Sequence, residues 1–421
     1  MTKPRAVVLV ANPAAPYSRG LRVARSLAGA GYEVEIAAVA ADGALPLEER
    51  DGAAADAGSV VTRRYRPSGP WAAWATGRPG LRGRLGWFGR AVDLLVKALA
   101  WPVHVRGWWA TLRRELPPAD LYHACGILAI GVALDLARGA RRAGRRGIVV
   151  YDVIDVILES NNVTDLPPPL LAWYRRRERG WVRRADVVVT VNDAIADHLA
   201  ATWPVRVRPT VLLNCQPRWS PPESRPDLIR AATGLPPERR IVLFLGRLGR
   251  ERGLEEAAEA VLALDDAALV LLGFGAWADR LRARDRDPRY AGRHVTLPPV
   301  HPDQVPAWTA SADVSIIAVS ANSLNQRLSS PNKFWESLAA GTPVVVGRDL
   351  VVMRAIVEAG RLGAVADPAD PADLARALRE VLEQAPADYA ALRERCLRVA
   401  RERYNWETAV GPYLELVARL V

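Results

Sequence analysis

The chain has 421 residues, of which 50% are hydrophobic, and this length and composition suit two or three domains with apolar cores. It contains no run of about 18 uncharged apolar residues, so the sequence predicts no membrane-spanning helix. The net charge of +11 is compatible with nucleic acid, anionic lipid or phosphate ligands, but no zinc-finger, aromatic RNA-binding or helix-turn-helix pattern occurs, so we expect no nucleic-acid partner.

Short runs rich in Val, Ile and Leu alternate with longer amphipathic stretches, a pattern typical of β-α-β units around a parallel sheet. A proline-rich linker over 209–226 separates two such halves. We therefore predict an α/β chain with domains at 1–215 and 216–404 and a terminal amphipathic helix at 405–421. The expected strands are 6–11, 34–39, 121–124, 148–153 and 186–191 in the first half, and 241–245, 268–273, 314–318 and 343–347 in the second.

The cysteines do not form a metal-binding or disulfide pattern. Cys125, Cys215 and Cys396 are far apart in the sequence. We expect buried thiols in a cytoplasmic protein and no metal site.

Residues 64–116 fit neither the strand nor the helix pattern. They hold six of the fourteen tryptophans, interleaved with arginines. Three interpretations remain open: the tryptophans pack helices onto the sheet, the segment forms an acceptor-binding insertion or lid, or it contacts a membrane surface. Tryptophan suits the membrane interface, and arginine suits anionic head groups.

A glycine-bearing turn follows the strand at 241–245, in the segment F-L-G-R-L-G-R-E-R-G-L-E-E-A (244–257). Gly246 allows close backbone approach to a ligand. Arg247 and Arg252 stand beside the predicted start of a helix near Leu254, a combination that suits a diphosphate. Guanidinium groups also pair with phosphate oxygens through two hydrogen bonds.

A second segment, S-S-P-N-K-F-W-E-S-L-A-A-G-T-P-V-V-V (329–346), predicts a helix that Ser330 caps and Pro331 opens. It follows a strand, at the sheet edge where ligands bind in α/β proteins. Lys333 falls in the first turn, where the helix dipole disfavours a cation unless an anion binds nearby. Glu336 shares its face and can accept hydrogen bonds from a ribose. The alternative is an ordinary surface pair of lysine and glutamate.

Residues 241–347 resemble the donor domain of retaining GT-B glycosyltransferases, specifically glycosyltransferase family 4. The motifs that carry the resemblance are G-R-L-G-R-E-R-G (246–253), L-G-F-G-A (272–276) and E-S-L-A-A-G-T-P-V-V-V (336–346). The resemblance implies a GT-B fold, in which two Rossmann-like, doubly wound parallel-sheet domains face a cleft. It also implies sugar transfer with retention, without a metal or a cofactor.

The resemblance implies a role for each donor-side residue. Arg247 and Arg252 neutralise the leaving diphosphate, and Lys333 and the amides near Asn332 add to this stabilisation. Ser330 is a further donor-binding candidate. Glu336 holds the ribose. Gly246 lies in the phosphate turn, while Phe274, Gly275 and Val300 frame the base, and UDP is the nucleotide we expect.

The first half shows a weaker resemblance. Gly20 stands where backbone amides of the family face phosphate or acceptor. L-Y-H-A-C (121–125) resembles a strand end with two histidines; Cys125 replaces the second, so His123 is the catalytic candidate, and a core histidine is the alternative. Leu328 occupies a position that is often acidic in the family.

We therefore expect a glycosyltransferase that moves a sugar from a nucleotide diphosphate sugar to a hydroxyl of a small-molecule or natural-product acceptor. A lipid-linked or polysaccharide acceptor at the inner membrane surface, with peripheral contact through 64–116, is one alternative. A sugar-nucleotide epimerase of the same fold and a non-catalytic nucleotide-binding protein are two others.

Overall fold

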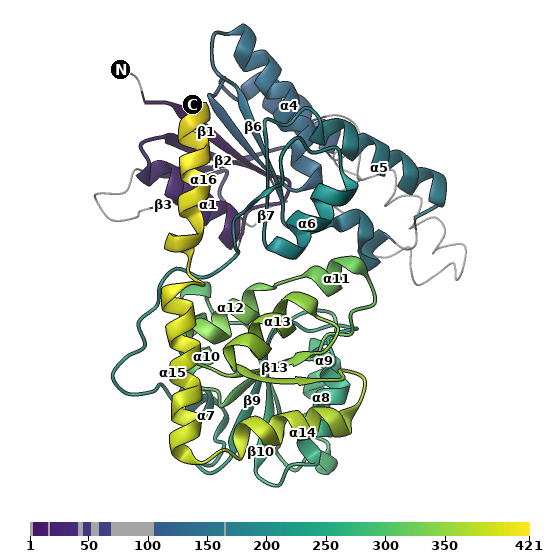
Figure 1. Ribbon diagram of the computed structural model, residues 1–421, viewed down its shortest axis with the longest axis vertical. Coiled ribbons are helices and arrows are strands. Elements are labelled where there is room, and N and C mark those ends of the chain that lie inside the picture. The colour runs from purple at the N-terminus through teal and green to yellow at the C-terminus, as the bar shows by residue number, and fades with distance from the viewer. Residues whose placement is uncertain (1–2, 16, 41–44, 52–58, 69–104, 164–165) are drawn as a thin grey trace. The chain divides into compact units, whose positions relative to one another are not determined.

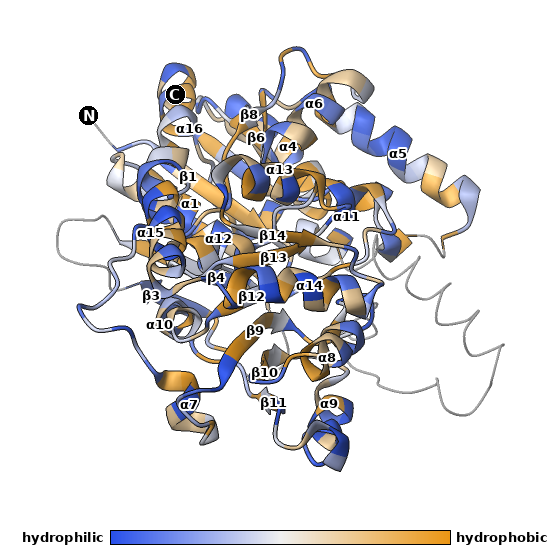
Figure 2. Ribbon diagram, turned by 60° about the horizontal axis from the view of Figure 1, so that its bottom comes forward, coloured by the Kyte–Doolittle hydropathy of each residue, from blue (hydrophilic) through white to orange (hydrophobic). Residues whose placement is uncertain are grey.

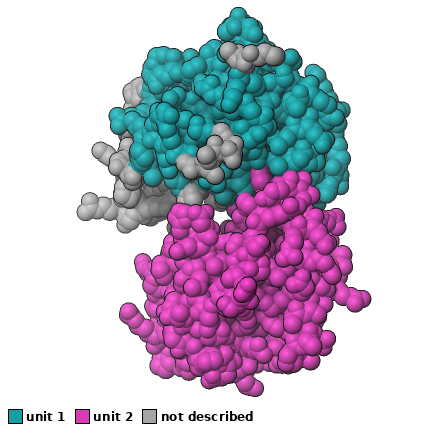
Figure 3. All heavy atoms as spheres, turned by 90° about the vertical axis from the view of Figure 1, so that its left-hand side faces the viewer, with its two compact units in different colours: residues 1–212, 410–421 teal, residues 213–409 magenta. Residues whose placement is uncertain are grey.

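The computed structural model describes residues 3–15, 17–40, 45–51, 59–68, 105–163 and 166–421. The chain forms two compact units, residues 1–212 with 410–421 and residues 213–409 (Figures 1 and 3). The first break falls between Leu212 and Leu213; the expected position was 215/216. Most of the tryptophan-rich segment 64–116 lies outside the described residues. Among the described residues, no helix is long and apolar enough to cross a membrane.

Unit 1 is built on an eight-stranded sheet in the order β3-β4-β2-β1-β5-β6-β7-β8. Its pairs are parallel except β3 with β4. The order reverses direction between β1 and β5, which makes their carboxyl ends the switch point of the sheet. The strands are β1 (Arg5–Val10), β2 (Glu33–Val39), β3 (Glu48–Asp51), β4 (Val60–Tyr65), β5 (Leu121–Cys125), β6 (Ile148–Val153), β7 (Val187–Thr190) and β8 (Thr210–Val211).

Helices flank this sheet in Figure 1. They include α1 (Ser18–Gly29), α4 (Ile127–Arg142), α5 (Pro168–Val182) and α6 (Asp193–Thr202), and residues 105–115 are also helical. The terminal helix α16 (Trp406–Leu420) belongs to unit 1 from Val410 onward.

Unit 2 is built on a six-stranded, wholly parallel sheet in the order β11-β10-β9-β12-β13-β14. Its switch point lies between β9 and β12. The strands are β9 (Arg240–Arg247), β10 (Ala267–Phe274), β11 (His294–Leu297), β12 (Val314–Ile317), β13 (Val344–Gly347) and β14 (Gly363–Ala366). The helices are α7 (Leu228–Thr233), α8 (Leu254–Leu262), α9 (Ala278–Arg284), α10 (Val305–Ala310), α11 (Leu324–Leu328), α12 (Asn332–Ala339), α13 (Val351–Gly360), α14 (Pro371–Leu382) and α15 (Pro386–Glu402).

The central strands of both sheets are apolar and buried. In β1 and β13 the residues 6–10 and 344–346 are at most 1% exposed. Figure 2 shows the same strands as hydrophobic ribbons, while α5 is largely hydrophilic. Because helices cover both faces of such a sheet, continuous apolar runs are favoured over alternation. The α/β prediction of two parallel-sheet domains is confirmed.

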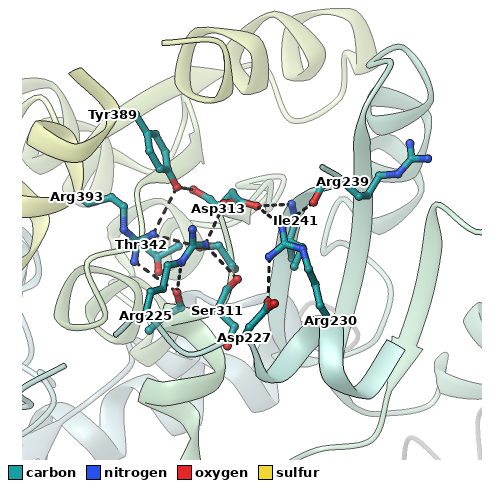
Figure 4. Close-up of polar contacts among 12 residues, drawn as sticks. Arg225, Asp227, Arg230, Arg239, Ile241, Ser311, Asp313, Thr342, Tyr389 and Arg393 are labelled. Carbon is teal, nitrogen blue, oxygen red and sulfur yellow. Dashed lines mark hydrogen bonds and ion pairs between the residues drawn. The ribbon is translucent and has the colours of Figure 1, made fainter. Parts of the chain in front are cut away.

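A buried carboxylate organises the amino-terminal edge of the sheet in unit 2 (Figure 4). Asp313 precedes β12 and accepts hydrogen bonds from Arg225 at 2.9 Å and from the Ile241 amide at 2.7 Å. Tyr389 on α15 donates to its backbone carbonyl at 2.7 Å. This network fixes α15 and the segment before α7 to the sheet, at the edge opposite the one where ligands bind.

Candidate functional site

Close backbone contacts define the carboxyl edge of the sheet in unit 2. A Cβ atom on Gly273 would lie 1.8 Å from the Gly246 carbonyl oxygen, and one on Gly253 would lie 1.9 Å from that of Ala318. Gly253 also has a φ of +66°, and Gly246 one of +116°. Only glycine adopts a positive φ without strain, and only glycine lacks the Cβ atom that would collide with these carbonyl oxygens. The loops after β9, β10 and β12 are thereby drawn together at the ligand edge.

Lys333 projects from the first turn of α12 onto the end of β9. Its Nζ lies 3.7 Å from the centre of the Phe244 ring, and a Cβ on Gly246 would come 3.6 Å from the same nitrogen. The glycine therefore leaves room for the ammonium group against the strand. Burial and then the charge of Arg252 lower the pKa of Lys333 to about 7, and the charge of Glu336 opposes this shift.

The start of α12 differs from the expectation by one residue. Helix α12 begins at Asn332, and Pro331 occupies the N-cap position, where it has no side chain that can cap. The prediction that Ser330 caps the helix is therefore wrong. Ser330 is buried, and its carbonyl accepts a hydrogen bond from the Trp335 indole at 3.1 Å. This hydrogen bond fixes the backbone of the segment that precedes α12.

Two residues of the linker segment orient the polar side chains of α12. Asn214 donates to the Asn332 side-chain oxygen at 2.5 Å, and Gln216 donates to Glu336 at 2.9 Å. Sequence reasoning did not identify either residue as part of the site. The only available signal was their place just after the last strand of the first half, in L-L-N-C-Q (212–216).

The remaining donor-side candidates lie along the same edge. Arg247 ends β9 as an exposed residue and stands in register with Phe274, whose side chain is 59% exposed at the end of β10. An exposed phenylalanine at a ligand edge is available to contact a planar base. Gly275 has a φ of +145° and would clash with the Leu248 carbonyl if it carried a Cβ. Val300 follows β11 and packs against a small apolar cluster.

His123 and Gly20, the candidates from the first half, lie in unit 1. The His123 ring is fully buried at the carboxyl half of β5. Its Nε2 contacts Asp152 at 3.1 Å and its Nδ1 contacts the Tyr413 hydroxyl at 3.0 Å. Both ring nitrogens therefore have partners within unit 1.

Asp152 is the centre of this buried group. Arg19 donates to both of its carboxylate oxygens, at 2.7 and 2.8 Å. Burial alone would raise the pKa of Asp152, but the charge and hydrogen bonds of Arg19, with the bond from His123, lower it to about 2. His123, Cys125 and Asp152 carry ligand-type atoms within 4.8 Å of one another. Both oxygens of Asp152 already accept hydrogen bonds from the Arg19 guanidinium, so the carboxylate has its counter-charge and the group does not fit a metal cation.

Gly20 lies in the first turn of α1, where a Cβ would come 2.6 Å from the Tyr17 ring. The glycine therefore lets the ring of Tyr17 lie across the start of the helix. Burial raises the pKa of the Tyr17 hydroxyl, and the nearby Cys125 and Asp152 raise it further. The structure thus supplies a packing reason for this glycine, in addition to the ligand contact that the sequence predicted.

Residues 239–384 match the family model described as glycosyl transferases group 1. The protein is a glycosyltransferase. The matched region of this glycosyltransferase holds Lys333, Arg247, Arg252 and the glycine turns of unit 2. No curated protein matches the sequence.

Solved structures similar to this glycosyltransferase share its fold at low sequence identity. Sucrose-phosphate synthase from Thermosynechococcus elongatus has a TM-score of 0.70 at 18% identity and covers 99% of both chains. Anabaena HepE in complex with UDP has a TM-score of 0.67 at 16% identity, covering 99% of this chain and 100% of that one. WaaG, a glycosyltransferase of lipopolysaccharide biosynthesis, has a TM-score of 0.62 at 15% identity, covering 98% and 99%. The likeness shows the GT-B fold.

Proposed function

We propose that the protein transfers a sugar, with retention of anomeric configuration, from a nucleotide diphosphate sugar to a hydroxyl of a small-molecule acceptor. The proposal rests above all on the pairing of Lys333 with Arg252. Two cations lie close enough for the charge of one to lower the pKa of the other. Such an arrangement costs free energy in the unliganded protein, and an anion bound between the two groups would recover it.

Each cation has a place in the reaction. Charge develops on the leaving diphosphate as the bond from the anomeric carbon to the phosphate oxygen breaks. Arg247, Arg252 and Lys333 stabilise that charge, and one preorganised donor of this kind contributes about 3 kcal/mol to the transition state. The electron pair of the broken bond remains on the diphosphate. The proposal therefore requires no metal ion for charge neutralisation.

The acceptor hydroxyl attacks from the face that the leaving group vacates. Its oxygen forms the new bond to the anomeric carbon, and its proton passes to an oxygen of the departing phosphate. This route gives retention without a carboxylate base. We assign His123 a positioning role in unit 1, because its buried ring joins Asp152 to Tyr413.

Nucleotide recognition falls to the loops around the cations. Glu336, which Gln216 orients, accepts hydrogen bonds from the ribose, and Phe274 and Val300 flank the base. UDP is the proposed nucleotide. Support comes from HepE, which was solved in complex with UDP and with UDP-glucose.

A second acceptor class is a lipid-linked molecule. The observation that favours it is an apolar pocket of unit 1 lined by tryptophans and arginines.

An epimerase would instead release free nucleotide and sugar product in the absence of any acceptor. A non-catalytic binding protein would bind the nucleotide and release neither.

The first test is thermal stability against UDP, GDP, dTDP, CMP and ADP. A ligand at 100 times its Kd adds about 2.7 kcal/mol of stability. We expect a shift with one diphosphate that is lost in Arg247→Ala and Lys333→Ala. Arg286→Ala is the matched control, because this exposed arginine follows α9, near the opposite edge of the sheet. If folded wild-type protein shifts with no nucleotide, or if the control loses the shift too, the proposed donor site is wrong.

A further inference from the structure

Three helices of unit 1 enclose an apolar pocket that the donor chemistry does not use. Residues 105–115, α4 and α5 contribute its walls, and the aromatic lining comes from Trp109, Trp173, Tyr174 and Trp181. Helices α4 and α5 and the turn Ile157–Glu159 also form a small apolar cluster of Ile127, Leu158 and Tyr174, with several partly buried neighbours. The pocket adjoins this cluster, because Ile127, Tyr174 and Trp181 belong to both.

One face of α5 arranges an arginine between two indoles. Trp173, Arg177 and Trp181 are spaced four residues apart, so they share a side of the helix. The Arg177 guanidinium carbon lies 5.3 Å from the centre of the Trp173 ring and 5.5 Å from that of Trp181. Cation–π contact of this kind holds the guanidinium at the wall of the pocket. Trp173 itself remains 43% exposed.

A glycine on α4 keeps the pocket open. A Cβ on Gly131 would lie 3.0 Å from the Trp181 ring and 3.2 Å from the Trp109 ring. The glycine therefore leaves room between the two indole rings, on the wall that α4 contributes to the pocket. The lining is mainly apolar, so a linear hydrocarbon chain can lie along it without loss of hydrogen bonds, whereas the hydroxyl groups of a sugar ring would lose theirs to water.

The polar groups of the pocket favour an anionic ligand. Arg106 and Arg177 line it, whereas the nearby Arg113, which stacks on Trp109 with its guanidinium carbon 5.3 Å from the ring centre, is already paired with Asp135. The Trp109 indole nitrogen is buried and has no hydrogen-bond partner in the described part of the chain. A buried donor without a partner costs free energy, and an acceptor oxygen on a ligand would relieve that cost.

We propose that this pocket binds the hydrocarbon chain of a phosphate-bearing lipid, with the phosphate held by Arg177 and Arg106. The inference rests on the proposed sugar transfer and commits to its second acceptor class: the acceptor is a lipid-linked molecule of this kind and not a small soluble molecule. The apolar walls contact the hydrocarbon chain, and the two arginines contact the anionic head group.

Decyl phosphate below its micellar concentration is the probe, and isothermal titration calorimetry is the measurement. We expect saturable binding of decyl phosphate. Inorganic phosphate and decyltrimethylammonium should each bind at least roughly tenfold more weakly, because the first lacks the chain and the second lacks the negative charge. Comparable binding of either probe would overturn the proposal.

Arg177→Gln should weaken decyl phosphate binding roughly tenfold. Arg176→Gln is the matched control: it makes the same charge change at the adjacent, exposed position of α5, which does not line the pocket. Equal losses in the two variants would show general attraction to a basic surface and would contradict a built site. Gly131→Ala narrows the pocket and should weaken decyl phosphate more than inorganic phosphate.

The UDP-induced thermal shift of the same preparations separates this inference from the proposed function. If the wild-type protein responds to a nucleotide but not to decyl phosphate, the proposed donor site stands and the proposed lipid pocket is wrong. Binding of anionic vesicles without binding of monomeric decyl phosphate would likewise replace the pocket by a membrane-surface contact. Decyl phosphate binding without any nucleotide response would support the lipid pocket and contradict the proposed donor site.

Discussion

The ammonium nitrogen of Lys333 lies 3.7 Å from the centre of the Phe244 ring, in the first turn of α12. The aromatic face stabilises the cation, but burial and Arg252 oppose it, and the pKa of Lys333 falls to about 7. This lysine therefore changes charge in the range where the enzyme would work. A bound diphosphate would raise the pKa of Lys333 again, because its negative charge favours the charged form of the lysine.

Nucleotide binding should therefore take up a proton. At pH 8.5 the free protein holds Lys333 mostly neutral, because its pKa is about 7, and the bound diphosphate restores the charge. We expect an uptake approaching one proton for each UDP bound at that pH and almost none at pH 6. Calorimetry in buffers of different ionisation enthalpy measures it directly. Lys333→Met should abolish the uptake, and an unchanged uptake in that variant would assign the proton to another group.

The same lysine should reduce the stability of the nucleotide-free protein. Its unfolded-state pKa is the ordinary 10.5 and its folded-state pKa is about 7, so the unfolded chain binds more protons between these values. Stability of the wild type consequently rises with pH across that window. Lys333→Met should raise the thermal midpoint at pH 7, by roughly 2 to 4 °C for each kcal/mol relieved, while transfer activity falls about a hundredfold or more.

The gain in thermal midpoint should shrink as the pH approaches 10, where the wild-type lysine is neutral in both states. Scanning calorimetry without nucleotide at pH 7 and pH 9.5 tests this. A variant that is less stable than wild type at pH 7 would indicate that the lysine serves packing and not anion binding.

Two glycines of one turn should respond differently to the same substitution. Gly253 has a φ of +66°, and a Cβ there would lie 1.9 Å from the Ala318 carbonyl oxygen, whereas a Cβ on Gly249 would meet nothing within 4 Å. Gly253→Ala should cost more than about 2 kcal/mol and abolish the UDP-induced shift. Gly249→Ala should change stability by less than about 0.5 kcal/mol. Urea denaturation of both variants makes the comparison, and similar losses would contradict the packing of this loop.

The central strands could be predicted because each is a continuous apolar run. The expected ranges at 6–11, 241–245 and 268–273 correspond to β1, β9 and β10 within a few residues. The edge strand β3 was missed because its sequence E-E-R-D is polar and pairs through the backbone. Strands of the same length that are rich in Val and Ile, such as β12 and β13, were predicted, whereas β14, G-A-V-A, was missed because it has a single β-branched residue.

The site was predictable where a motif marks a strand end, and not where a contact joins distant segments. Gly246, Arg252 and Lys333 follow buried strands, so topology alone brings them to one edge. The bond from Gln216 to Glu336 spans 120 positions and begins in a linker without periodicity. Arg19 and Asp152 are 133 positions apart, and no local pattern distinguishes a buried arginine from the many exposed ones.

The Arg19–Asp152 pair should be indispensable for unit 1. Both side chains are at most 2% exposed and share two hydrogen bonds. Arg19→Met leaves a buried carboxylate without its counter-charge and should cost about 3 to 5 kcal/mol. The double variant with Asp152→Asn should lose less than the sum of the two single losses. Chemical denaturation of the four proteins gives the coupling energy, and additive losses would show that the pair acts as two independent residues.

The pH dependence of this pair has a definite sign. The folded-state pKa of Asp152 is about 2, below its ordinary value of 3.8. Its contribution to stability is therefore present above pH 3.8 and is lost as the pH falls toward 2. Asp152→Asn should remove that part of the acid sensitivity of unit 1.

Glu178 should produce the opposite dependence near neutral pH. It lies on α5, accepts a hydrogen bond from the Tyr151 hydroxyl at 2.6 Å, and is 5% exposed. Burial raises its pKa from 4.5 to about 7, so the folded state binds more protons than the unfolded chain between these values. Unit 1 should thus be most stable below pH 4.5 with respect to this group, and should lose about 3 kcal/mol as the pH rises through 7.

Glu178→Gln keeps an oxygen that can accept the Tyr151 hydrogen bond and removes the titration. The variant should match the wild type near pH 5 and exceed it at pH 8, when urea midpoints of the unit 1 transition are compared across this range. Glu115→Gln, an exposed glutamate of the same unit, is the control and should leave the wild-type pH profile unchanged. If Glu178→Gln keeps the wild-type profile as well, the carboxyl is ionised in the folded protein and a cation not yet assigned must balance it.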